Sequence, residues 1–276
     1  MSPASKATHS FHYNAHGHGL SGQFHRPFQE MIEVQAGMSL PLIGGHGHSR
    51  AENFKFKEIV SFKSAYTHVS GSQDKDDQSH DTLVTATVEG LNILDVVTAD
   101  RIVARIATHH EPGEDEPRII PLGSRFENLQ ISSHPMKIDL DTHLFSELDT
   151  YSAFKSKFDK DKKFRDAVRE RFFWGNVGKD VPEFVRARYN WSKGDGLPES
   201  RGTILCSLVK NIENLCPGVQ RHGNVLVVPQ FGRIFLAEFL IKKHSRSLIM
   251  LRIELGSPVE GQILASGGEG NGIPWP

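Results

Sequence analysis

The side chains with the clearest chemical potential in this sequence are histidines near its start. Seven of the 15 histidines fall within the first 48 of the 276 residues, and two HGH triplets each place a pair of them two positions apart. In an extended chain, residues two positions apart point to the same side. Imidazole nitrogen is a good ligand for zinc, copper and nickel. The candidate ligands of a transition metal are therefore His16, His18, His46 and His48.

A second interpretation of these histidines needs no metal. Both triplets lie in glycine-rich segments, where nothing fixes an imidazole ring, so exposed side chains are the simpler expectation. Histidine titrates near neutral pH, so these residues could instead make the start of the chain sensitive to pH. The adjacent residues His109 and His110 follow a predicted strand, and we expect both at the surface.

Other catalytic motifs are missing from the sequence. There is no G-x-S-x-G elbow, and Cys206 lies in an apolar strand pattern, which favours a buried, unreactive thiol. Neither Cys206 nor Cys216 belongs to a C-x-x-C motif; we expect two unpaired thiols, with a bridge between adjacent strands as the alternative. The glycine-rich run at 267–272 precedes no helix or lysine, so it predicts no phosphate site. The sequence therefore favours a protein without catalytic activity.

The charge balance argues against partners that are recruited by long-range electrostatics. The chain has 32 Lys and Arg against 33 Asp and Glu, a net charge of −1, which attracts neither nucleic acid nor an anionic membrane. Basic residues between 155 and 171 alternate with acids, as on a solvated helix face. No apolar stretch reaches the roughly 20 residues that span a bilayer, and no signal peptide is recognisable. We expect no membrane span, and the localisation stays open.

Hydrophobic periodicity predicts a mainly β protein. Between Thr82 and Thr108, apolar and β-branched residues alternate with polar ones, as on a half-buried pleated surface. Strands are expected in two blocks, at about 30–140 and 203–264. The second block contains a hairpin of Arg233–Ile241 and Ser247–Leu255. Because this hairpin is apolar on both faces, we expect it at the centre of the core.

The first block of strands carries two specific expectations. The apolar residues from about Phe54 to Ser70 change phase near Glu58 to Val60, which suggests a bulge or a bend in one long strand. The run 42–49, which contains the second HGH triplet, predicts a turn-rich loop.

A helical segment is expected between the two blocks. From about Thr150 to Phe173, phenylalanines recur every three or four residues among charged ones, which is typical of an amphipathic helix. A shorter helix is expected from about Asp180, its candidate N-cap, to Asn190.

These elements predict a single β-sandwich-like domain over residues 28–264, with a two-helix insertion at about 150–190. Residues 1–27 show no sustained periodicity and are expected to form a flexible N-terminal arm. Residues 265–276 are rich in glycine and are expected to form a flexible C-terminal tail.

One stretch of strand residues is similar to a known family. Residues 85–94, TATVEGLNIL, and 97–104, VTADRIVA, lie within a segment at 82–107 that resembles bacterial choice-of-anchor-type surface proteins. The resemblance implies a β-rich structural or adhesive protein, and it supplies no functional residues. The sequence differs from that family because no signal peptide or cell-wall anchor is evident.

The function expected from the sequence is that of a structural or interaction protein, which assembles with itself through its terminal arms and sheet edges. A metal-binding protein or metal-dependent enzyme that uses the four histidines is the alternative. A third hypothesis is a β-sandwich that binds carbohydrate or another ligand through exposed aromatic residues, for which the candidates are Trp174, Tyr189, Trp191 and Trp275.

Overall fold

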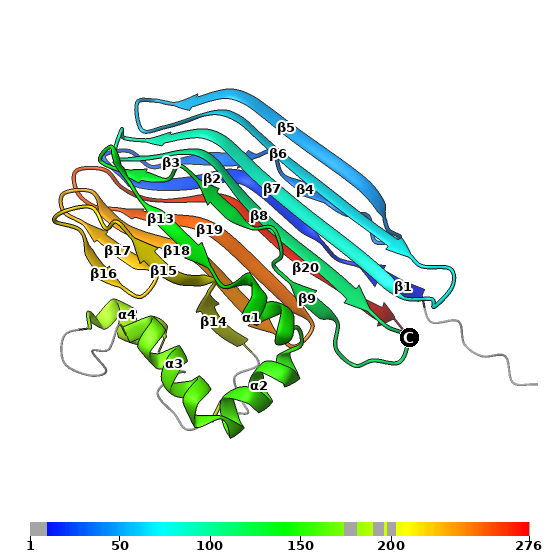
Figure 1. Ribbon diagram of the computed structural model, residues 1–276. Coiled ribbons are helices and arrows are strands. Elements are labelled where there is room, and N and C mark those ends of the chain that lie inside the picture. The colour runs from blue at the N-terminus through cyan, green and yellow to red at the C-terminus, as the bar shows by residue number, and fades with distance from the viewer. Residues whose placement is uncertain (1–9, 174–180, 190–195, 198–202, 276) are drawn as a thin grey trace, which may run out of the picture.

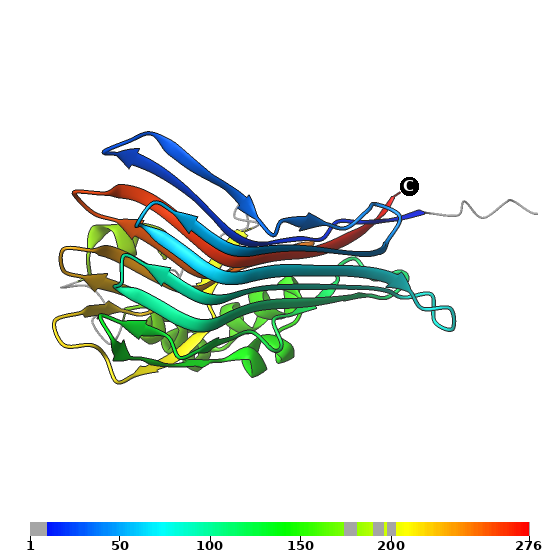
Figure 2. The ribbon, with the colours of Figure 1, turned by 90° about the horizontal axis from the view of Figure 1, so that it is seen from above.

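Two large antiparallel sheets pack face to face (Figures 1 and 2), with strand β20 over β7 and β8 and strand β2 over β6 and β7. The computed structural model describes residues 10–173, 181–189, 196–197 and 203–275. Among the described residues, strands account for 59% and helices for 13%, which confirms the predicted mainly β, sandwich-like fold.

The first sheet has ten strands, in the order β16-β17-β18-β19-β20-β2-β3, with β1 on β20, β4 on β2 and β14 on β18. Their bounds are β1 (Ser10–Tyr13), β2 (His16–Arg26), β3 (Glu30–Gln35), β4 (Met38–Ser39), β14 (Thr203–Ser207), β16 (Gln220–His222), β17 (Val225–Val228), β18 (Gly232–Lys242), β19 (Ser245–Leu255) and β20 (Glu260–Trp275).

The second sheet has eight strands, in the order β12-β11-β8-β7-β6-β5, with β9 and β10 also on β8. Their bounds are β5 (Gly45–Phe56), β6 (Val60–Gln73), β7 (His80–Ile93), β8 (Val97–His110), β9 (Arg118–Ile120), β10 (Arg125–Glu127), β11 (Gln130–Ile131) and β12 (His134–Pro135). A separate pair is formed by β13 (Lys137–Leu140) and β15 (Val209–Glu213).

The long strands of the eight-stranded sheet form hairpins at positions where the backbone adopts positive φ. Leu94 and Asp95 have φ of 53° and 55° between β7 and β8, in a turn that the amide of Val96 closes on the carbonyl of Ile93 (3.0 Å); two successive residues with positive φ are typical of a type I′ turn. The phase change predicted as a bulge or a bend near Glu58 is also a hairpin: Lys57 has a φ of 51°, and β5 ends before it and the chain returns as β6. The predicted loop at 42–49 is shorter than expected, because β5 already begins at Gly45.

The two terminal segments form strands, so the predicted flexible arm and tail are wrong for the described residues. Strand β2 pairs with β20 along nearly its whole length, and β1 pairs with the last residues of β20 (Figure 1). The error has a physical cause. Periodicity is a pattern of side chains, and a strand rich in glycine has few side chains to show it.

Glycine has a positive role here, because it lets the two sheets approach closely. A Cβ added at Gly17 would lie 2.9 Å from carbons of both Thr67 and Val84, and one at Gly268 would lie 2.8 Å from Val84. The buried Ser266 joins the sheets directly. Its hydroxyl accepts a hydrogen bond from the amide of Ala104 (2.8 Å) and donates one to the carbonyl of Ala86 (2.8 Å).

The predicted apolar hairpin is confirmed as β18 and β19. These strands pair in register and lie in the middle of the ten-stranded sheet. Most of their side chains are buried whichever face they point to, as expected for strands that are covered on both sides.

The helices gather on one side of the ten-stranded sheet, near β14 and β18 (Figure 1). They are α1 (Thr142–Glu147), α2 (Tyr151–Lys160), α3 (Lys162–Phe173) and α4 (Glu183–Arg188). The single helix expected from Thr150 to Phe173 is two helices, since the Asp161 carboxylate accepts a hydrogen bond from the amide of Phe164 (3.1 Å) and so caps the second. The predicted N-cap Asp180 lies outside the described residues.

Candidate functional site

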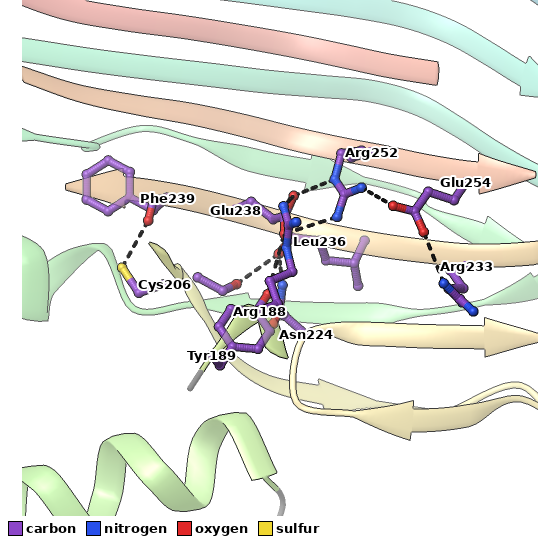
Figure 3. Close-up of polar contacts among 11 residues, drawn as sticks. Arg188, Tyr189, Cys206, Asn224, Arg233, Leu236, Glu238, Phe239, Arg252 and Glu254 are labelled. Carbon is purple, nitrogen blue, oxygen red and sulfur yellow. Dashed lines mark hydrogen bonds and ion pairs between the residues drawn. The ribbon is translucent and has the colours of Figure 1, made fainter. Parts of the chain in front are cut away.

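The most concentrated group of charges surrounds a buried carboxylate, Glu238 on β18, whose side chain is 3% exposed. Arg188 of α4 donates to both of its oxygens, at 2.6 and 2.9 Å, and Arg252 of β19 donates at 2.7 Å (Figure 3). The hydroxyl of Tyr189 lies 3.4 Å from the same carboxylate. Burial and the nearby charge of Glu238 raise the pKa of Tyr189, so this hydroxyl remains protonated and can donate.

From Glu238 the charges continue to the surface. Arg252 also bonds to Glu254, which pairs with Arg233 at 3.4 Å (Figure 3). Two aromatic rings cover the arginines: the guanidinium of Arg252 lies 3.5 Å from the ring centre of Phe235, and that of Arg233 lies 3.9 Å from the ring of Phe184. Such stacking favours arginine over lysine at both positions.

An irregularity in β18 lies directly before Glu238. Ala237 has a φ of 46° and does not pair with the opposite residue of β19, although the register is the same on both sides. The hydroxyl of Ser207 and the amide of Asn224 both donate to the carbonyl of Leu236, at 2.8 and 3.1 Å, and so satisfy a backbone group next to this irregularity.

These contacts make the group a structural clamp. Both oxygens of Glu238 are occupied by arginines, and the carboxylate is closed to solvent, so it has no free face for a substrate. It joins helix α4 to the two central strands. The sequence contains a signal for this clamp: a charge inside the otherwise apolar runs IFLAEFLI and LIMLRIEL must be buried, and a buried charge needs a partner.

A cleft of 710 Å³ opens beside the outer end of this clamp. It lies between the β17–β18 and β19–β20 turns, and Arg233 and Glu254 line it together with His25 and Glu260. Its charges are already compensated, since Arg233 pairs with Glu254 and Arg26 pairs with Glu260 at 3.5 Å. The cleft therefore selects no charged ligand.

The four candidate metal ligands lie on two different sheets. His16 and His18 belong to β2, while His46 and His48 are exposed on β5. The ring of His18 lies over Gly267, and burial lowers its pKa. Nowhere in the described part of the chain do three or more His, Cys, Asp or Glu side chains gather as a metal site. Among the described residues, the four histidines therefore do not form a common site, and metal binding stays a hypothesis.

Most of the chain matches one known protein family. Residues 11–242 match the family described as a domain of unknown function, DUF8256. The chain belongs to this family. The DUF8256 match runs from within β1 to the end of β18, so it includes the whole eight-stranded sheet and the residues of the clamp up to Glu238. No curated protein and no solved structure matches the chain.

The structure describes both cysteines of this DUF8256 protein and some of the aromatic residues that were candidates for ligand contact. Cys206 and Cys216 are buried and form no disulfide bond, which confirms the prediction of two thiols that are not bridged. Tyr189, a candidate for ligand contact, is fully buried against Glu238. Trp174 and Trp191 lie outside the described residues, and only the backbone of Trp275 is described.

Among the described ranges, no helix has the length and apolarity needed to cross a bilayer.

A second group of histidines, which the sequence did not reveal, fastens β1 to the sandwich. The ring of Phe11 stacks on His80 at 3.8 Å, and the hydroxyl of Tyr13 lies 2.9 Å from Nδ1 of His80. His110 is the cross-strand partner of His80 and is 3% exposed, so its predicted surface position is wrong. Neither of its ring nitrogens has a hydrogen-bond partner in the described part, although the backbone of Glu114 is close.

These contacts predict that the attachment of β1 weakens in acid. Burial lowers the pKa of both His80 and His110, and the charges of neighbouring histidines add to this effect, whereas the backbone of Glu114 opposes it for His110. The unfolded chain, in which histidine has a pKa of about 6.5, therefore takes up these protons more readily than the folded one. The neutral state of these two histidines therefore stabilises the fold fully above about pH 6.5. This stabilisation is lost as the pH falls below that value, by up to about 1.4 kcal/mol per pH unit for each histidine.

Thermal unfolding measured between pH 7.5 and 5 tests this prediction. We expect the unfolding temperature to fall less steeply with acid in His110→Leu than in the unaltered protein. His143→Gln is the matched control, because that side chain is 88% exposed. Equal slopes in all three proteins would contradict a role for His110.

Proposed function

We propose that this protein is a non-enzymatic interaction protein that assembles with a second copy of itself along the side of the sandwich formed by β3, β4 and β5. We call this side the β3–β5 side. The observation that supports the proposal is the open edge of β5, a strand of 12 residues that pairs with β6 alone among the described strands. A free edge presents unpaired backbone N–H and C=O groups, which can pair with another strand.

Exposed apolar side chains gather next to this edge. Six large hydrophobic side chains are exposed among the described residues. Met31 and Val34 lie on β3, and Leu42 and Ile43 lie just before β5. Ile43 is 91% exposed. Strands β3 and β4 of the ten-stranded sheet contact β5 of the eight-stranded sheet. Free backbone groups and apolar surface on one side of a molecule are typical of an interface.

The charges on β5 favour a copy of the same strand as the partner. Arg50 and Glu52 alternate in sign along the strand and are more than half exposed. If two β5 strands paired antiparallel about a twofold axis at Ala51, Arg50 of each copy would lie opposite Glu52 of the other. Such a contact is self-complementary, as a symmetric dimer requires. A different strand paired with β5 would in most cases leave Arg50 or Glu52 without an opposite charge.

The mass of the protein in solution, measured by light scattering over a range of concentrations, tests the proposal. We expect a dimer for the unaltered protein and a monomer for the double variant Val34→Glu, Ile43→Lys, with unchanged circular dichroism. Leu122→Lys is the matched control, since Leu122 is 56% exposed and lies between β9 and β10, near the opposite edge of the same sheet.

Two results would refute this assignment. If the unaltered protein stays monomeric at every concentration, the proposed self-association does not occur. A dimer that survives the double variant but is broken by Leu122→Lys must form through another surface.

A further inference from the structure

The pairing of β7, β8 and β9 creates an apolar floor on the outer face of the eight-stranded sheet, next to β6. Ser70 of β6 lies opposite Leu83 of β7, Leu83 opposite Ala107 of β8, and Ala107 opposite Ile120 of β9. Residues in register share a face. Leu83, Ala107 and Ile120 therefore form a continuous strip, which is only partly buried.

Polar side chains border this strip and form the walls of a hollow above it. Asp81 and His109 form the next cross-strand pair on one side, and Arg105 lies two positions before Ala107 on the other. Ser146 of α1 and the nearby Asp149 close one end. The enclosed space has a volume of 500 Å³, and we call it the β7–β8 hollow. A hollow with an apolar floor and a few converging polar groups is the usual form of a small-molecule site.

Most charges around the hollow already have partners. His109 lies 2.8 Å from Asp81 through Nδ1, and Arg118 pairs with Glu111 at 3.3 Å. Asp149 interacts electrostatically with the buried guanidinium of Arg246.

Arg105 is the exception. Its side chain is exposed and passes close to Gly123, and its guanidinium has no hydrogen-bond or ion-pair partner among the described residues. Arg105 thus places a positive charge without a partner in the described part of the chain beside an apolar floor, which the carboxylates of Asp81 and Asp149 also border.

We propose that the β7–β8 hollow binds a small apolar anion, namely a carboxylate or sulfonate carried on an aromatic or aliphatic body. The body would cover Leu83, Ala107 and Ile120, and the acid group would pair with Arg105. The guanidinium offers a planar fork that matches a carboxylate or sulfonate. This site is separate from the edge of β5 and does not depend on the proposed self-association.

The fluorescent anion 8-anilinonaphthalene-1-sulfonate is a suitable probe, and its neutral analogue N-phenyl-1-naphthylamine is the comparison. We expect saturable binding of the sulfonate to the folded protein at one site. Arg105→Gln should weaken it about tenfold or more, as expected for the loss of one charge-assisted hydrogen bond. The neutral analogue should bind both proteins equally, because it makes no use of the charge.

Arg125→Gln is the matched control, since Arg125 lies on the neighbouring strand β10, is 50% exposed and pairs with Glu127 outside the hollow. Leu83→Glu should abolish the binding of both probes. Amide chemical shifts should change on β7, β8 and β9 when the sulfonate is added. Sulfonate binding that is absent, that is unchanged in Arg105→Gln, or that falls equally in Arg125→Gln would overturn the proposal.

Discussion

Replacing Glu238 by glutamine is expected to lower the free energy of unfolding by about 3–5 kcal/mol, the usual cost of removing one partner from a buried ion pair. The amide keeps the shape of the side chain but removes its charge. Arg252, whose side chain is 6% exposed, then keeps its positive charge in the interior with only the partly exposed Glu254 as a counterion. The amide oxygen can still accept from one guanidinium but the NH2 group cannot, so Arg188 keeps at most one of its two hydrogen bonds to residue 238, and a contact that holds α4 on the sheet is weakened.

Urea unfolding followed by circular dichroism measures this effect. Glu213→Gln is the matched control: that carboxylate forms an ion pair with Lys137 at 2.8 Å but is 48% exposed, so its loss should cost about 0–1 kcal/mol. If both substitutions cost the same, Glu238 does not act as the buried clamp that its contacts indicate.

Replacing Gly17 by alanine is expected to destabilise the fold by about 1–3 kcal/mol, the typical cost of overpacking a core. The new methyl group would lie 2.9 Å from carbons of Thr67 and Val84 and 3.2 Å from the carbonyl oxygen of Gly267. Backbone lies on one side and a packed sheet on the other, so the methyl group can be accommodated only if the two sheets move apart.

Gly256→Ala is the control for this substitution, because an added methyl group there would meet its nearest neighbour at 3.6 Å, an ordinary contact. A second variant identifies the contact itself. In the background of Val84→Ala, the cost of Gly17→Ala should be smaller, since one of the two crowding side chains has been shortened. An equal cost in both backgrounds would show that crowding against Val84 is not the cause.

The sequence predicted those elements whose side chains repeat with a clear period. The alternation from Thr82 to Thr108 became β7 and β8, and the apolar run of residues 233–255 became the central hairpin β18–β19. The phenylalanines of 150–173 identified helical structure but not the break at Asp161, where one aspartate caps a new helix. Local signals of this kind depend only on neighbours along the chain.

The sites are predicted less well, because they join residues that are distant in the sequence. Glu238 and Arg188 are 50 residues apart, and the floor of the β7–β8 hollow combines residues from three strands. The HGH triplets show the converse case. Each has the spacing of a ligand pair, yet β2 and β5 belong to different sheets, so local spacing does not bring the four imidazoles together.

By itself, then, the sequence determined the β class, the central hairpin and the helical segment, since each is a periodic pattern of side chains. Only the tertiary structure decided that the glycine-rich ends are strands, that Glu238 is clamped by two arginines and that β5 is left as an open edge. The physical reason is the same in each case. Glycine contributes no side chain to a pattern, and the pairing of strands and charges is set by long-range register, which no single segment of the chain contains.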